Sequence, residues 1–191
     1  MTTVTDTLDD IAATAVLVLA LSTPAGVTIP AAAAALGRDE AWVRWQVGAD
    51  TTSDTITAVE DLRTGATRYR YADLVVTDIT LIAGALLVLA EHDWAQGEHQ
   101  DDLGRVDITG ALSLAAGVHP QELPDAPHLL DALLAAEDTL AVDLGYDPTE
   151  VDAGDTVAAW QDDPDRTADE VHALLIDIVT YTAPTKTDTA R

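Results

Sequence analysis

The apolar residues of the chain fall into helix-length runs that are separated by short groups of turn-forming residues. The first run extends from near Asp6 to Leu21 and ends at the helix-breaking segment 22–26, Ser-Thr-Pro-Ala-Gly. Thr28 is a good N-cap for a second helix, which continues through Ala31–Leu36. Gly37 supplies the left-handed residue that ends many helices. The pattern therefore predicts two helices before residue 38.

A third helix and a β-hairpin are expected next. Asp39 can cap a helix over Glu40–Val47, and the turn before it is very short, as in a helix-turn-helix. A polar loop follows over residues 48–54. Residues 56–59 and 67–71 then read as strands joined by a turn at residues 63–65.

The second strand alternates basic and aromatic residues. A strand points successive side chains to opposite faces, so Arg68 and Arg70 should share one face and Tyr69 and Tyr71 the other. This hairpin therefore resembles a wing with a basic face.

From Asp78 onward the pattern is helical throughout. The clearest local signal is Thr167-Ala-Asp-Glu170, a capping box at the start of the last helix. The helical spacing of aliphatic residues predicts five further helices, over residues 79–91, 108–116, 129–142, 156–160 and 168–181.

These elements predict a mainly α fold that has two parts. We expect a winged-helix unit of three helices plus a hairpin in residues 1–75, and an acidic all-helical domain in residues 76–183. Residues 184–191 are expected to form a disordered tail.

Charge is distributed unevenly between the two parts. The chain has 34 acidic and 9 basic residues, a net charge of −25. Residues 1–75 hold 10 acids and 5 Arg, a net of −5, whereas residues 76–191 hold 24 acids and 4 bases, a net of −20. All five N-terminal Arg lie between positions 38 and 70, which suggests a nucleic-acid face on an otherwise anionic protein.

Composition excludes several classes of protein. There is no Cys, which rules out disulfides and thiolate metal sites. The apolar runs Ile11–Leu21 and Ile79–Ala90 are far shorter than the roughly 20 residues of a membrane span, so no membrane partner is expected. The start MTTVTDTLDD lacks the basic region of a signal peptide, and a cytoplasmic location is the expectation.

The order of helices and hairpin over residues 6–73 resembles the winged helix-turn-helix domains of bacterial transcription regulators. The string GVTIPAAAAALGRDEAWVRWQV (26–47) is similar to their two-helix motif. The resemblance implies that Arg44 and Trp45, beside Glu40 and Ala41, face the major groove of DNA. The set of candidate DNA-binding residues that follows is Arg38, Arg44, Trp45, Arg63, Arg68 and Arg70, of which the last three would track phosphates. The alternative is a winged helix that serves as a scaffold or a protein-docking unit.

The second half resembles a small all-helical domain of unknown function that is found in actinobacteria and their phages. The resemblance rests on HDWAQG (92–97), DDLGR (101–105), ITGALSLAAG (108–117) and WQDDPDRTADEVHALL (160–175). Where this chain has Gln161, the family usually shows Asn. The match implies a fold and a source but no activity.

No pattern in the chain predicts catalysis or a cofactor. Neither a G-x-S-x-G motif nor a phosphate-binding glycine loop occurs, and the acidic stretch 91–102 lacks a His or carboxylate pair at i,i+4 on one helix, the usual start of a metal site. The acids between 147 and 155 do not fit the spacing of a calcium loop. We therefore expect no catalytic residue, no metal and no enzyme activity.

Three hypotheses follow. In the first, the chain is a DNA-binding regulator whose winged helix contacts double-stranded DNA while the acidic domain forms a homodimer or binds a partner. In the second, it is an acidic interaction protein, in the extreme a DNA mimic, that binds a basic protein. In the third, the acids only keep a halophilic protein soluble.

Overall fold

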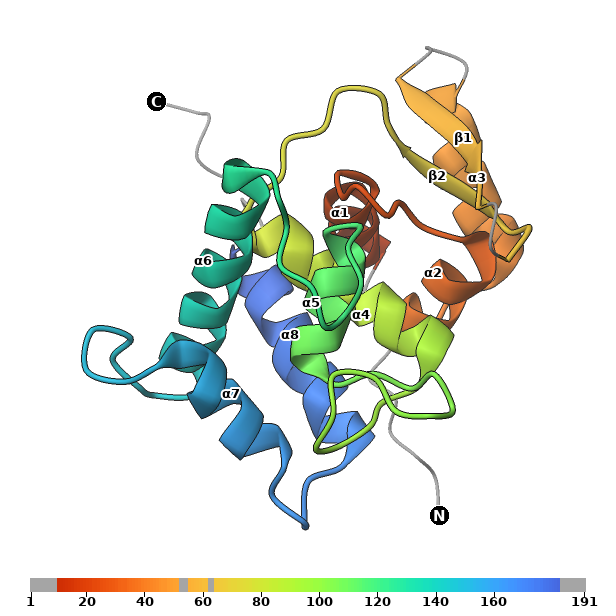
Figure 1. The fold of residues 1–191 in the computed structure, drawn as a ribbon. Coiled ribbons are helices and arrows are strands. Elements are labelled where there is room, and N and C mark those ends of the chain that lie inside the picture. Colours follow the sequence, from red (N-terminus) through yellow and green to blue (C-terminus); the bar gives the residue numbers. More distant parts are fainter. Residues whose placement is uncertain (1–9, 52–54, 62–63, 183–191) are drawn as a thin grey trace, which may run out of the picture.

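The computed structural model of the chain describes residues 10–51, 55–61 and 64–182, which form eight α-helices and one antiparallel β-hairpin (Figure 1). The three N-terminal helices and the hairpin come first and five helices follow, which confirms the predicted fold class. The elements are α1 (Asp10–Leu21), α2 (Ile29–Leu36), α3 (Glu40–Thr51), β1 (Ile56–Glu60), β2 (Thr67–Tyr71), α4 (Asp78–His92), α5 (Ile108–Ala115), α6 (Pro127–Asp143), α7 (Ala153–Gln161) and α8 (Ala168–Thr182).

Helix α2 begins and ends where its capping residues predict. The hydroxyl oxygen of Thr28 accepts a hydrogen bond from the N–H of Ala31 at 3.3 Å. Gly37 has a φ of 61°, and its N–H donates to the carbonyl oxygen of Ala34 at 3.3 Å. The capping box of α8 is also present, because the Glu170 carboxylate accepts from the N–H of Thr167 at 2.9 Å.

Two helices extend three residues or more beyond a predicted end. Helix α3 continues to Thr51 rather than Val47, because Gly48 weakens a helix without breaking it and nothing crowds its backbone. Helix α7 begins at Ala153 rather than 156, because the carboxylate of Asp152 caps it by accepting from the N–H of Asp155 at 3.0 Å. The predicted start near residue 6, the turn at 63 and the tail 184–191 lie outside the described residues.

The hairpin is joined by a third segment that the sequence did not reveal. Strands β1 and β2 pair in register from Ile56 opposite Tyr71 to Glu60 opposite Thr67. Just before α2, Val27 forms a bridge to Tyr69 of β2 through two hydrogen bonds of 2.9 and 2.8 Å. The chain between α1 and α2 therefore lies along the free edge of β2.

Helix α4 occupies the centre of the fold, where Figure 1 shows the other helices around it. Every residue from Thr80 to Leu89 is buried, and α4 contacts α1, α2, α5, α6 and α8. One hydrophobic cluster includes Leu17 and Leu36 from the first part and Leu112 and Leu175 from the second. Both parts of the chain thus share a core, and the division at residues 75 and 76 stays a prediction.

Although α4 is strongly apolar, it does not have the length of a membrane span. Within the described residues, no helix combines the length and the apolar character that are needed to cross a bilayer.

Gly84 marks the closest approach of α4 to its neighbours. A Cβ at this position would lie 2.7 Å from Cγ2 of Thr23 and 2.9 Å from Cβ of Ala115. We predict that Gly84→Ala destabilises the protein by about 1–3 kcal/mol, because overpacking outweighs the better helix propensity of Ala. Urea unfolding would measure the change in the free energy of unfolding.

The matched control is Gly48→Ala in α3. An added Cβ there meets no atom within 4 Å, so this variant should be about 0.5–1 kcal/mol more stable than the wild type. Equal stabilisation by the two substitutions would contradict the tight packing at Gly84.

Candidate functional site

Arg38, the first of the predicted DNA-binding residues, lies against α1 and α3. Its Nη2 forms an ion pair with the carboxylate of Asp10 at 3.0 Å, and its guanidinium carbon lies 5.7 Å from the ring centre of Trp42. Only 16% of the Arg38 side chain is exposed. Arg38 therefore helps to hold these helices together.

Helix α3 presents Arg44 and Trp45 to solvent. The Arg44 side chain is 61% exposed, and Trp45 is 67% exposed. However, Nη2 of Arg44 lies 2.7 Å from the carboxylate of Glu40, one turn earlier on the same helix. An exposed pair of this kind contributes only a few tenths of a kcal/mol, so it can be broken by a competing anion.

Arg68 of the hairpin is held by two carboxylates. Its Nη2 lies 2.8 Å from Glu91 of α4, and its Nε lies 3.2 Å from Asp61. Its side chain is 15% exposed. Arg70 instead donates from Nη1 to the carbonyl oxygen of Pro24 at 2.9 Å.

The predicted alternation of the strand is present, but its basic face points inward. Arg68 and Arg70 line one cavity, and Tyr69 lines another. Their common face is turned toward α4 rather than toward solvent, since the ion pair of Arg68 with Glu91 crosses to that helix. Arg63 lies outside the described residues.

The remaining described arginines are also engaged with their own chain. Arg105 pairs with Asp101 at 2.7 Å, and Arg166 pairs with Glu170 at 3.5 Å while stacking 3.9 Å from the ring centre of Trp160. Of the six arginines in the described part of the chain, five therefore contact a carboxylate and one a carbonyl oxygen. The DNA-binding set stays a prediction, and its charge is largely offset within the protein.

Two cavities lie on either side of β2. The first has a volume of about 580 Å³ and lies between the hairpin, α4 and α5. The second, of about 650 Å³, lies between α2, β2 and the end of α4, with Arg44 at its edge. Both volumes are in the range of small-molecule sites.

A buried amide connects the loop before α5 to the end of α7. Gln161 is fully buried, and its Nε2 donates to the Asp107 carboxylate at 3.0 Å while its Oε1 accepts from the N–H of Ile108 at 2.8 Å. Asp107 also caps α5 by accepting from the N–H of Gly110 at 2.6 Å. Nδ1 of His99 lies 3.0 Å from the same carboxylate.

The loop that follows α4 adds further bonds to this network. The side-chain amide of Gln96 donates to the carbonyl oxygens of Gln161 and Asp163 at 2.9 and 2.8 Å. The N–H of Gly97 donates to the carboxylate of Asp162 at 2.8 Å. The turn after α7 is therefore held to a loop more than sixty residues earlier.

Three of the four strings that carry the family resemblance in the second half meet at this network. Gln96 belongs to the string 92–97, and Gln161 belongs to the string 160–175. Asp107 caps the helix that begins the string 108–117. Pattern analysis missed the network because its members are far apart in sequence. The signal that points to it is a single amide, Gln161, in an otherwise charged stretch.

A sequence comparison bears on this half of the chain. The profile of a "Family of unknown function (DUF6197)" matches residues 73–177, more than half of the 191 residues. The chain belongs to DUF6197. No curated protein and no solved structure matches it. The DUF6197 region starts just after β2 and contains α4 and the whole network around Gln161.

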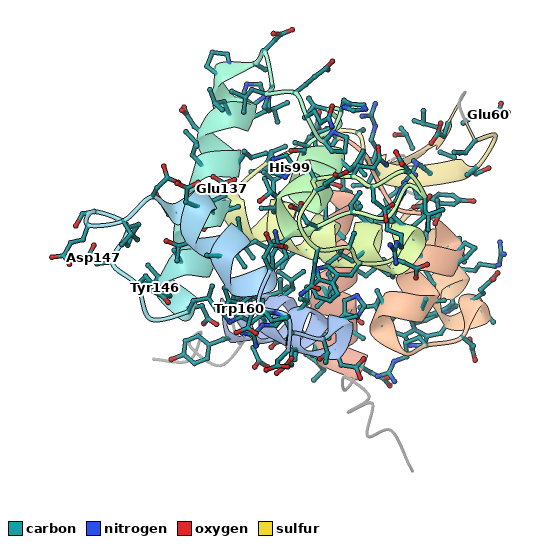
Figure 2. All side chains as sticks on the ribbon, turned by 60° about the horizontal axis from the view of Figure 1, so that its bottom comes forward. Glu60, His99, Glu137, Tyr146, Asp147 and Trp160 are labelled. Carbon is teal, nitrogen blue, oxygen red and sulfur yellow. The ribbon has the colours of Figure 1, made fainter. Side chains whose placement is uncertain are left out.

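Within the DUF6197 region, Glu137 of α6 has an unusual ionisation, and Figure 2 shows it beside His99. Burial, the largest cause, and the negative charge of Asp152 together raise the pKa of the Glu137 carboxyl to about 7, while His99 opposes the shift. Neither Glu137 nor His99 lines either cavity. Within the described parts of the chain, no three His, Asp or Glu residues gather in a way that could hold a metal.

The outer face of α6 is both acidic and apolar. Leu134 and Val142 are 49% and 57% exposed, and Tyr146 just beyond the helix is 49% exposed. Asp131 and Asp138 are exposed at helical spacing with them. We call these five residues the α6 face; Figure 1 shows α6 at the edge of the fold, and Figure 2 shows Tyr146 near its outer end.

The raised pKa of Glu137 predicts a pH-dependent stability. The folded state keeps the proton up to about pH 7, whereas the unfolded state loses it near 4.5, so stability falls as pH rises through this window. Glu137→Gln should remove this fall and make the protein more stable than the wild type at pH 8, by about 1–2 kcal/mol after solvent screening. Urea unfolding at pH 4, 6 and 8 would measure it.

Glu150→Gln serves as the control, because Glu150 is exposed. It should leave the pH profile of stability unchanged. A profile for Glu137→Gln that parallels the wild type would show that Glu137 ionises normally.

Proposed function

We propose that this DUF6197 protein is a non-enzymatic interaction protein whose acidic surface binds a basic protein partner. The observation that carries the proposal is the pairing of its arginines. Each of the six in the described part of the chain bonds to the protein itself, and five of these bonds are ion pairs with carboxylates. Since the chain has 34 acids against 9 bases, most of its acids have no basic side chain to neutralise them.

This pairing weakens the case for duplex DNA as the partner. Proteins that bind DNA electrostatically neutralise about 6–10 phosphates with Lys and Arg, and they release counterions as they do so. A phosphate approaching Arg68 would have to displace both Asp61 and Glu91 from a side chain that is only 15% exposed. The surrounding carboxylates would also repel the DNA backbone.

The α6 face supplies the contact surface for such a partner. Protein interfaces have an apolar centre that is surrounded by a polar rim, and aromatic residues are enriched at the centre. Leu134, Val142 and Tyr146 provide apolar area, and Asp131 and Asp138 provide negative charge on the same helix surface. The complementary partner is a basic amphipathic helix, with Lys or Arg beside exposed aliphatic residues.

A second candidate function is DNA binding by a winged helix, as the regulator resemblance implies. The bridge between Val27 and Tyr69 favours it, because it places a third extended segment, just before α2, beside the two-stranded hairpin. The exposed Arg44 and Trp45 of α3 would then make the contacts. In this alternative the acidic helices serve for homodimer formation or partner binding.

We predict that the purified protein binds a synthetic basic amphipathic peptide, with Leu on one face and Lys or Arg on the other, and does not bind random-sequence duplex DNA. Fluorescence anisotropy from 20 to 300 mM salt would measure both. The double variant Asp131→Lys/Asp138→Lys should weaken peptide binding by about tenfold or more, because it reverses the charge of the α6 face.

The matched control is Asp73→Lys/Asp102→Lys, which changes the net charge equally at two exposed acids outside α6. This control should lose much less affinity. Equal losses in the two variants would overturn a specific α6 contact and leave only non-specific attraction. Salt-dependent DNA binding that is lost in Arg44→Ala would instead favour the winged-helix function.

A further inference from the structure

The cavity between the hairpin and α4 is the place where basic side chains converge. Arg68 and Arg70 come from β2, His92 from the end of α4, and His119 from the loop after α5. The cavity has a volume of about 580 Å³. Since the chain has only 9 Lys and Arg against 34 acids, this gathering differs from the rest of the surface.

The two arginines play different parts. Arg68 lies between the carboxylates of Asp61 and Glu91, which neutralise it and fix the hairpin to α4. Arg70 donates to the carbonyl oxygen of Pro24, which is a neutral acceptor. Among the described residues, no carboxylate forms an ion pair with Arg70.

Arg70 therefore retains its positive charge in a partly buried position. Burying a charge without a counter-ion is costly, and a guanidinium has five N–H donors, of which the bond to Pro24 uses one. An anion that entered the cavity could accept two parallel hydrogen bonds from the guanidinium. It would supply the missing counter-charge.

Apolar side chains form most of the rest of the cavity wall, which also includes Gln100 and Asp61. Val88 of α4, Leu114 of α5, and Val118 line it, together with Pro24 and Pro120. Apolar walls with a few placed polar groups are typical of sites for small organic molecules. The wall thus selects for a ligand with a hydrophobic body.

The number of nearby acids limits the charge of that ligand. Asp61 lines the cavity and Glu91 pairs with Arg68 from beside it, so a polyanion such as a nucleoside triphosphate would meet repulsion. One unpaired arginine matches one negative charge. We propose that this cavity binds a small apolar monoanion, such as an aromatic or aliphatic carboxylate, with its carboxylate on Arg70.

This site goes beyond the proposed protein-binding function and does not depend on it, since the α6 face lies on a different element. A molecule in the cavity would contact β2, α4 and α5 at once. It would therefore strengthen the attachment of the hairpin to the helices of the DUF6197 region.

The test uses 2-naphthoate as the monoanion and 2-naphthamide as its neutral analogue, with binding to the full chain followed by two-dimensional amide NMR. We expect saturable binding of 2-naphthoate with a Kd below about 1 mM, with shifts at residues of the cavity wall, and much weaker binding of the amide. Arg70→Gln should weaken 2-naphthoate about tenfold or more, because it removes the charge.

Arg105→Gln is the matched control, since Arg105 pairs with Asp101 on an exposed loop and does not itself line the cavity. It should bind 2-naphthoate as the wild type does. A second variant, Val118→Trp, fills the cavity and should abolish binding while the circular dichroism spectrum stays native. Undiminished binding by Arg70→Gln, shifts confined to another surface, or no saturable binding below about 1 mM would overturn the proposal.

Discussion

The fold depends on one helix that has no polar face. Ten consecutive residues of α4 are buried, so it must be covered on every side, and α1, α2, α5, α6 and α8 provide that cover. The covering helices come from both parts of the chain, which explains why the N-terminal helices and the DUF6197 region share one hydrophobic cluster. The close contacts of Gly84 with Thr23 and Ala115 show how tightly this helix is enclosed.

The central position of α4 also sets the electrostatics of the hairpin. Glu91 near the end of α4 reaches Arg68 on β2, and this ion pair turns the basic face of the strand toward the helices. A partly buried pair of this kind is costly to break, because separating it leaves an uncompensated charge. The hairpin is thereby bonded to the DUF6197 region through Arg68, one of the residues that a DNA-binding wing would need free.

Local signals in the sequence were sufficient for most elements but not for the site. The Thr28 and Gly37 caps, the limits of β2 and the capping box before α8 are short-range features, and they are all present in the structure. The predicted end of α3 was wrong because a glycine such as Gly48 can lie inside a helix as well as end one. The predicted start of α7 was wrong because an aspartate such as Asp152 can cap a helix as well as lie in a loop. The network of Gln161 with Asp107, and the pairing of Arg68 with Glu91, depend on tertiary contacts across 54 and 23 residues. Side-chain periodicity predicts which residues share a face of a helix or strand, but not which other segment of the chain packs against that face.

This distinction is the basis of the function that we propose. Clustering of five arginines in the sequence suggests a nucleic-acid surface, yet charge acts at a surface only where no closer counter-charge neutralises it. In a chain with nearly four acids for each base, an arginine meets carboxylates of its own protein at much shorter range than any external phosphate. Once these pairs have formed, the described surface still has more carboxylates than arginines. A group that binds to it through charge must therefore be positive. Arg70 is the exception, because it contacts a carbonyl oxygen rather than a carboxylate. Its charge is not offset by an acid, and its complement is an anion.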